Sequence, residues 1–163
     1  MNPNNDLTHF DPNGNARMVD VGSKAPTERI AVARAQVRMN RETADLIQQK
    51  AVHKGDVLQV ARVAGIMAAK RTDELIPLCH SLNLSSTEIE FEFVDSNLLQ
   101  ITTRVKTTGP TGVEMEALVA ASAAALTVYD MCKSVDRLMA IREIVLLEKR
   151  GGKSGTWLRE AIT

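Results

Sequence analysis

The chain has 163 residues with 20 acidic and 20 basic side chains, so its formal net charge at neutral pH is zero. This length suits one domain with a sizeable core, and the lack of an overall basic field argues against nucleic acid as the main partner. Two cysteines, Cys79 and Cys132, are too few for a disulfide scaffold, and three scattered histidines give no zinc-site spacing. The first residues lack the apolar core of a signal peptide, so we expect a cytoplasmic protein with no membrane partner.

The ends of the chain are expected to be mobile, and the middle to form one domain. Residues 1–15 are rich in Asn and Asp and are interpreted as a flexible N-terminal segment. Residues 150–163 are interpreted as a flexible, Gly-rich basic tail. Residues 16–149 then form a single domain, with a first short strand predicted at residues 17–21.

A strand and two helices are predicted next. In residues 29–39 the odd positions from Ala31 to Met39 are all apolar, and Arg34, Gln36 and Arg38 alternate with the later ones, which is typical of a strand with one buried face. Asn40 is placed to cap a helix over residues 41–52, and Asp56 to cap a second helix over residues 57–70. Small side chains along one face of the second helix permit the close approach of another backbone.

A β-hairpin is predicted after an apolar segment that carries one histidine. His80 ends the segment Leu-Ile-Pro-Leu-Cys-His, and a single His beside apolar residues is more often a structural residue than a catalyst. Residues 87–94 alternate Glu with Ile and Phe, which indicates a strand with one wet face. Residues 99–106 return after a polar turn and complete the hairpin.

The rest of the chain is organised around one long helix. Thr111 followed by Glu114 has the spacing of a capping box, so this helix is expected to start there and to run to Lys133. Residues 117–129 carry no charge and have apolar side chains all round, which indicates a helix buried on nearly every side, under a sheet or against another copy of itself. The uncharged run is shorter than the ~20 residues of a membrane span.

A last strand over residues 141–149 completes the predicted domain. The order of elements predicts an α+β fold of the ferredoxin-like kind, with an antiparallel sheet and helices packed on one face. Gly152, Lys153 and Ser154 match the end of a phosphate-binding loop, but the glycine needed five positions earlier is Leu147, so that motif is rejected. A flexible tail could still bring Lys149 or Lys153 to an anion.

The charges at the ends of the long helix have two interpretations. Glu114 and Glu116 in the first turn, and Asp130 with Lys133 in the last, are what the helix dipole and an i, i+3 ion pair favour. Charges on a buried helix are costly, however, unless they are paired or used for function. Together with His80 and the cations near other helix ends, they suit a phosphorylated ligand that Lys and Arg hold while a carboxylate, Lys or His moves protons.

Seven blocks of the sequence resemble one enzyme family. They are Met-Val-Asp-Val (18–21), Lys-Gly-Asp-Val-Leu (54–58), Ala-Arg-Val-Ala-Gly-Ile-Met-Ala-Ala-Lys-Arg-Thr (61–72), Leu-Ile-Pro-Leu-Cys-His (75–80), Gly-Val-Glu-Met-Glu-Ala-Leu (112–118), Tyr-Asp-Met-Cys-Lys (129–133), and Leu-Leu-Glu-Lys with Gly-Gly-Lys-Ser-Gly (146–155). Across residues 7–155 the chain resembles the cyclic pyranopterin monophosphate synthase family, the molybdenum cofactor biosynthesis protein C or MoaC family. After His80 the family often has Pro-Leu-Pro-Leu, whereas this chain has Ser-Leu-Asn-Leu.

The resemblance implies a lyase of molybdenum cofactor biosynthesis. The expected substrate is (8S)-3′,8-cyclo-7,8-dihydroguanosine 5′-triphosphate, whose purine is opened and rebuilt into a pyranopterin while a cyclic phosphate forms and pyrophosphate leaves. The resemblance also implies a ferredoxin-like fold and a homohexamer, a trimer of dimers, with active sites between subunits. No metal or other cofactor is expected in the protein itself, and the sequence leaves open whether Mg²⁺ accompanies the triphosphate.

The resemblance also implies roles for individual residues by motif position. The acid/base centre would be Lys54, Asp130 and Lys133. The base and sugar portion would be held by His80, Glu114 and Glu116, and Leu78, Cys79 and Met115 would also bind the substrate. The triphosphate would be held by Arg29, Lys70, Arg71 and Lys149, and Asp20 is a site position with no assigned role. A lysine near other cations or shielded from water loses proton affinity, which would suit a base near neutral pH.

Two other hypotheses remain open from the sequence. A nucleotide-sensing or RNA-binding module would need surface aromatic side chains for base stacking, and the chain has only Phe10, Phe91, Phe93, Tyr129 and Trp157. A purely structural oligomer would need only the helices rich in small residues. Turnover of the cyclic triphosphate distinguishes the enzyme from both.

Overall fold

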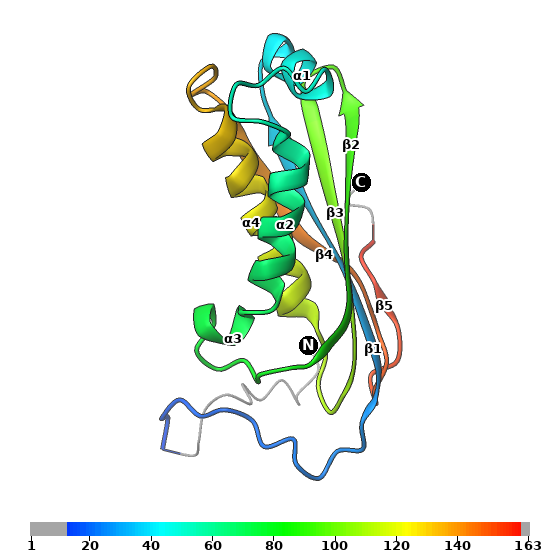
Figure 1. Cartoon of the computed structure of the whole chain (residues 1–163). Helices are drawn as coiled ribbons and strands as arrows, with labels where there is room; N and C mark the ends of the chain where they lie inside the picture. Colours follow the sequence, from blue (N-terminus) through cyan, green and yellow to red (C-terminus); the bar gives the residue numbers. More distant parts are fainter. Residues whose placement is uncertain (1–12, 161–163) are drawn as a thin grey trace.

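The computed structural model describes residues 13–160, and its elements have the order of a ferredoxin-like domain (Figure 1). The strands are β1 (Thr27–Arg38), β2 (Leu84–Asp95), β3 (Leu98–Gly109), β4 (Ala140–Arg150) and β5 (Trp157–Leu158). The helices are α1 (Arg41–Gln48), α2 (Val57–Ala69), α3 (Thr72–Leu75) and α4 (Glu114–Cys132). All pairs in the sheet β2-β3-β1-β4-β5 are antiparallel, and α2 and α4 cover one face, so the predicted fold class is confirmed.

The covered face of the sheet is built from small and β-branched side chains. On β1 the alternate residues Ala31, Ala33 and Ala35 are fully buried, as the period of two predicted. Short side chains at the centre of the sheet let α4 lie close to it. Thr103 on β3 uses this proximity, because its hydroxyl donates a hydrogen bond of 2.8 Å to the carbonyl of Ala117.

Helices α2 and α4 pack closely because of Gly65. A Cβ atom at Gly65 would lie 2.9 Å from the carbonyl oxygen of Ala120 and would collide with the Ile89 side chain. The absence of a side chain therefore sets the distance between the two helices. The predicted N-cap of α2 is confirmed, since Asp56 accepts a hydrogen bond from the backbone N–H of Gln59 at 3.2 Å.

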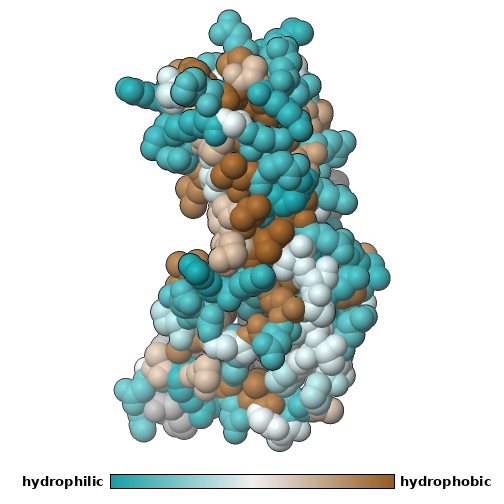
Figure 2. All heavy atoms as spheres, in the orientation of Figure 1, coloured by the Kyte–Doolittle hydropathy of each residue, from teal (hydrophilic) through white to brown (hydrophobic). Residues whose placement is uncertain are grey.

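Helix α4 is buried on two sides and open on the third, so the prediction of burial on nearly every side is wrong for a single chain. Its open side carries Leu126, which is 60% exposed, and the helix α2 that packs against it also has exposed apolar side chains, Val60, Val63 and Met67. Figure 2 shows hydrophobic side chains gathered in the hollowed middle of this face. Among the described residues α4 alone is long and apolar enough to cross a membrane, which corrects the length argument, but half of its most apolar stretch is buried.

The ends of several elements differ from prediction. α1 ends at Gln48, well before residue 52, because Lys50 adopts a left-handed φ of 54° and the N–H groups of Lys50 and Ala51 bond back to Ile47 and Leu46. This is a Schellman motif. The predicted flexible segment at residues 1–15 lies mostly outside the described residues.

Two features of the chain ends also differ. No strand forms at residues 17–21, because this segment runs as an exposed loop whose Val19 carbonyl accepts a bond from His80. The stretch 150–163, expected to be a flexible tail, contains β5, in which Trp157 and Leu158 pair with Lys149 and Glu148. A strand of two residues is too short for a period-two pattern to reveal.

Candidate active site

Two adjoining cavities lie at the end of the sheet where α4 begins. The cationic cavity has a volume of about 810 Å³ and includes Arg29, Lys149, Arg150 and Lys153 in its lining. The His80 cavity has a volume of about 290 Å³ and is lined partly by apolar side chains. Four residues line both: Lys24, Thr111, Gly112 and Glu114.

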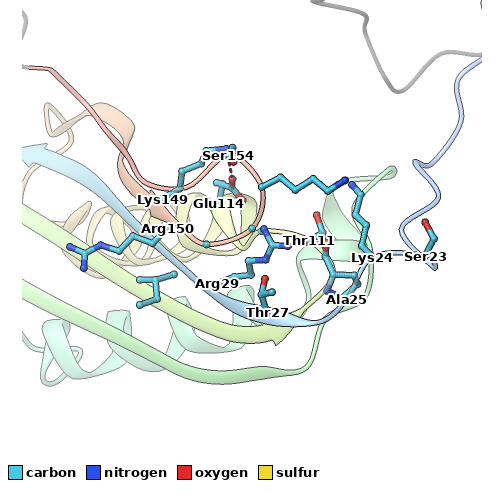
Figure 3. A pocket seen from close by; sticks show the side chains of 16 residues that line it. Ser23, Lys24, Ala25, Thr27, Arg29, Thr111, Glu114, Lys149, Arg150 and Ser154 are labelled. Carbon is cyan, nitrogen blue, oxygen red and sulfur yellow. Dashed lines mark hydrogen bonds and ion pairs between the residues drawn. The ribbon is translucent and has the colours of Figure 1, made fainter.

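The cations of the cationic cavity come from neighbouring strands. Arg29 on β1 donates hydrogen bonds to the carbonyls of Gly109, at 3.4 Å, and Pro110, at 3.3 Å, which fixes its guanidinium at the cavity wall. Lys149 on β4 lies 3.6 Å from a carboxylate oxygen of Glu114 (Figure 3). An excess of fixed positive charge in one cavity suits a polyanionic ligand.

The capping box predicted at Thr111 does not form. The N-cap of α4 is Val113, and no side chain caps the helix. The Glu114 carboxylate instead lies against Gly112, where any Cβ atom would collide with it, and pairs with Lys149. Thr111 and Glu114 are thus both left facing the cavities.

Glycines of the segment after β4 let the backbone wrap closely around Arg29. Gly151 and Gly152 have φ values of 100° and 71°, a conformation that side chains disfavour. A Cβ atom at Gly152 would collide with the Arg29 guanidinium. This close approach places Lys153 and Ser154 in the wall of the cationic cavity.

His80 has a defined tautomer in the His80 cavity. Its Nε2 lies 2.7 Å from the carbonyl oxygen of Val19. A carbonyl can only accept, so Nε2 must carry the hydrogen, and in the neutral ring Nδ1 is left as an acceptor. Nearby, burial and the carboxylates of Glu116 and Asp73 raise the pKa of the Cys79 thiol, which therefore stays protonated at neutral pH.

Glu116 is the buried carboxyl group of the His80 cavity. Only 4% of the residue is exposed. Burial raises its pKa to about 7, against the lowering effect of its own backbone N–H, and the carboxylates of Glu114 and Asp73 add to the rise. A carboxyl group that titrates near neutral pH can donate as well as accept a hydrogen bond there.

This pKa predicts a pH dependence of stability that Glu116→Gln should remove. The folded value, about 7, exceeds the unfolded reference of 4.5, so protonation stabilises the fold. That contribution is complete below pH 4.5 and is lost as the pH rises through 7. We expect the free energy of unfolding of the wild type, relative to Glu116→Gln, to fall by about 3 kcal/mol over this range in urea titrations. Parallel curves for the two proteins would contradict the assignment.

A second cluster lies at the far end of α4. Asp130 pairs with Lys133, Oδ1 to Nζ, at 2.7 Å and with Lys54, Oδ2 to Nζ, at 3.7 Å, and Lys54 also donates to the Asp130 carbonyl at 2.9 Å. The hydrogen bond and charge of Lys133, and then the charge of Lys54, lower the pKa of Asp130. Asp130 in turn raises the pKa of Lys133. The expected loss of proton affinity is therefore wrong for Lys133 in the single chain, where Asp130 favours the protonated amine.

The two clusters are separated by the length of one helix. Glu114 and Asp130 are sixteen positions apart, which corresponds to roughly 24 Å along the axis at ~1.5 Å per residue. One nucleotide cannot easily contact both ends of the same helix. In the single chain, the predicted acid/base residues and the predicted ligand-binding residues therefore form two separate groups.

Known proteins resemble the chain over nearly its whole length. A model of the MoaC family matches residues 18–152. The chain belongs to this family. Three relatives are each called cyclic pyranopterin monophosphate synthase. The relative from Chloroflexus aurantiacus is 62% identical and the one from Magnetococcus marinus is 57% identical, each over 95% of this chain and 96% of the relative. The relative from Clostridium botulinum is 56% identical over 96% of this chain and 99% of the relative.

The geometry of this MoaC family member brings most of the predicted ligand-binding residues together. The two cavities include Arg29, Leu78, Cys79, His80, Glu114, Met115, Glu116 and Lys149 in their walls. Lys70 and Arg71 are exposed just after α2, at the end of the molecule where α4 begins (Figure 1), but they line neither cavity. Asp20 lines neither cavity, although its neighbours Val19 and Val21 line the His80 cavity.

Sequence patterns missed several lining residues. Lys24 and Ser23 stand in an irregular segment before β1, where no periodicity marks a lysine as different from other exposed ones. Ser81, where this MoaC chain departs from the family, donates a side-chain hydrogen bond to the Asp73 carboxylate, whereas the Thr107 hydroxyl donates to the backbone carbonyl of Asn83 at 2.6 Å. At residue 81 the departure thus replaces the rigidity of a proline with a side-chain hydrogen bond, whereas the carbonyl at residue 83 could accept the Thr107 bond with a proline there as well.

Proposed function

We propose that this MoaC family member is a cyclic pyranopterin monophosphate synthase, which converts (8S)-3′,8-cyclo-7,8-dihydroguanosine 5′-triphosphate to cyclic pyranopterin monophosphate and pyrophosphate. The observation that carries the proposal is the name shared by relatives that are 56–62% identical along nearly the whole chain. The site agrees in shape and charge. The cationic cavity suits a triphosphate, and the smaller His80 cavity offers Glu116 and His80 for hydrogen bonds to a base.

We further propose that the enzyme assembles as a cytoplasmic homohexamer, a trimer of dimers, with each site shared between two subunits. The separation of the two clusters along α4 supports sharing, because a two-fold axis can place the Glu114 end of one chain beside the Asp130 end of its partner. The exposed apolar side chains of Val60, Val63 and Met67 on α2 and of Leu126 on α4 give the helical layer apolar surface to bury in such an interface.

The RNA-binding alternative is not favoured by the fold. Base stacking on a ferredoxin-like sheet uses aromatic side chains on its open face. Phe91 and Phe93 pack instead against the core under the helices, and the guanidinium of Arg62 covers the Phe91 ring at 5.3 Å. No observation in the described part of the chain points to a purely structural role.

Incubation of the purified protein with the cyclic dihydroguanosine triphosphate tests the proposed function directly. We expect equal amounts of pyrophosphate and of a fluorescent pterin derived from the product after oxidation. GTP serves as the matched control, because it carries the same triphosphate and glycosidic bond but lacks the second bond, which joins C8 of the base to C3′ of the sugar. Release of pyrophosphate from neither compound, with the protein folded and assembled, would overturn the proposal.

Neutralising the cations of the cationic cavity should weaken substrate binding. We expect Arg29→Ala or Lys149→Ala to reduce affinity about 10- to 100-fold, the effect of losing one charge-assisted hydrogen bond. The remaining affinity should depend less on salt, and Arg29→Lys should not restore it, because a lysine lacks the guanidinium fork. Titration calorimetry at two salt concentrations measures both effects, and Lys70→Ala and Arg71→Ala test whether these two residues contribute from a neighbouring subunit. Unchanged binding in all of these variants would show that these cations are ordinary surface charges that do not bind the triphosphate.

A further inference from the structure

The segment before β1 crosses from one cavity to the other. Its first part lines the His80 cavity through Val19 and Val21, and its second part lines the cationic cavity through Ser23 and Lys24. His80 anchors the segment, because its Nε2–H donates to the Val19 carbonyl at 2.7 Å. Lys24 is the only member of the described lining that brings a cation to both cavities.

Asp20 organises the turn that carries Lys24. Its Oδ1 accepts a hydrogen bond from the backbone N–H of Gly22 at 2.8 Å. The next bond of the turn runs from the N–H of Lys24 to the carbonyl of Val21, at 3.0 Å. The Asp20 carboxylate is thus engaged with its own backbone, whereas the Lys24 side chain lies at the junction of the cavities beside Thr111 (Figure 3).

The junction of the two cavities, where Lys24 and Thr111 line both, can be assigned to one part of the substrate if the base occupies the His80 cavity and the terminal phosphates occupy the cationic cavity. The sugar portion and the α-phosphate then lie between them. Formation of the cyclic phosphate takes place at this phosphorus: an oxygen of a sugar hydroxyl bonds to it, the bond to the bridging oxygen breaks, pyrophosphate leaves with the electron pair, and the hydroxyl proton passes to water. A cation at the junction stabilises the charge that develops on the phosphoryl oxygens.

We propose that Lys24 binds the α-phosphate during cyclisation and that Asp20 is a positioning residue, which holds the turn that presents Lys24 to the junction. The proposal rests on the proposed function for the identity of the substrate. Arg29 and Lys149 line the cationic cavity and not the His80 cavity. The proposal therefore assigns them to the terminal phosphates, which leave as pyrophosphate, and assigns Lys24 to the α-phosphate. The proposal also explains why the family resemblance includes Asp20 among the site positions although Asp20 lines neither cavity.

Four variants and one double variant test the proposal by pyrophosphate release and substrate titration. Lys24→Ala should lower kcat about 10- to 100-fold with a smaller change in KM than Arg29→Ala causes, because the contact strengthens in the transition state. Lys24→Arg should restore part of kcat. Asp20→Ala should lower kcat in the same way, whereas Asp20→Asn should stay within a few fold of wild type, because its amide oxygen can accept the same bond from Gly22. The double variant Asp20→Ala/Lys24→Ala should be no slower than Lys24→Ala alone.

The outcomes separate failure of this proposal from failure of the proposed function. If the wild type does not release pyrophosphate, the proposed function fails first. If the wild type is active but Lys24→Ala behaves like Lys106→Ala, a control on β3 outside both cavities, the role of Lys24 is overturned. If Asp20→Asn is as slow as Asp20→Ala, or if the double variant shows additive losses, Asp20 acts through its charge on the substrate and not by positioning Lys24.

Discussion

A mixture of Glu114→Ala and Asp130→Ala proteins, each inactive alone, is expected to regain about a quarter of wild-type activity once subunits exchange. The reason is the separation of the two residues by roughly 24 Å along α4. If each site takes Glu114 from one chain and Asp130 from its partner, a mixed dimer has one site with both defects and one intact site. Random pairing makes half of the dimers mixed, which gives the expected fraction if sites act independently.

The structure supplies a matched control for this experiment. Lys149 lies 3.6 Å from Glu114, at the same end of α4. Mixing Glu114→Ala with Lys149→Ala therefore leaves every site with one defect and should restore nothing beyond the parent proteins. Exchange is verified by mass spectrometry of isotope-labelled subunits. Full exchange without recovery in the first mixture would show that the site does not combine these two residues from different chains.

Lys54→Ala and Lys133→Ala are each expected to abolish product formation while leaving fold and assembly intact. Both lysines and Asp130 are largely exposed, with side-chain exposures of 43%, 52% and 61%. Ion pairs between exposed groups contribute little to stability, so the melting temperature should change by a few degrees at most. The loss of turnover would then reflect the chemistry of the amines and not a damaged structure.

The second surface pair of the same kind provides the control for these variants. Lys50 pairs with Asp56 at 3.0 Å and is also exposed, but it lies in neither cluster. Lys50→Ala should keep both activity and stability. Turnover near the wild-type rate in both Lys54→Ala and Lys133→Ala would remove the acid/base assignment, and a large fall in melting temperature would return the cluster to a structural role.

Secondary structure was predictable wherever one face of an element is buried. The alternation of apolar side chains in β1 and β2 reflects a sheet with helices on one face only, and the order of these elements was enough to indicate the ferredoxin-like fold. Termini depended on local conformations that composition does not reveal, such as the left-handed backbone at Lys50. The Thr111 cap failed because the Glu114 carboxylate is drawn to Lys149, a residue distant in sequence.

The candidate site was predictable as a set of motifs but not as an arrangement. Motif resemblance pointed to residues at both ends of α4, and only the structure shows that these residues form separate clusters in one chain. Lys24 was missed because it lies in an irregular segment, where its position depends on the bond between His80 and Val19. Contacts of that kind join segments sixty residues apart and leave no local pattern.

The length of α4 is itself a functional quantity. If its two ends supply complementary halves of shared sites, the distance between the Glu114 and Asp130 ends of the helix must be the same in both partners. Removing a single turn would shorten it by about 5.4 Å and move one half of every site away from the other, although the core contacts of the remaining residues could survive. We therefore expect insertions and deletions to be tolerated at the β2–β3 turn and not within α4, where even a change that folds well would misalign the two halves of each site.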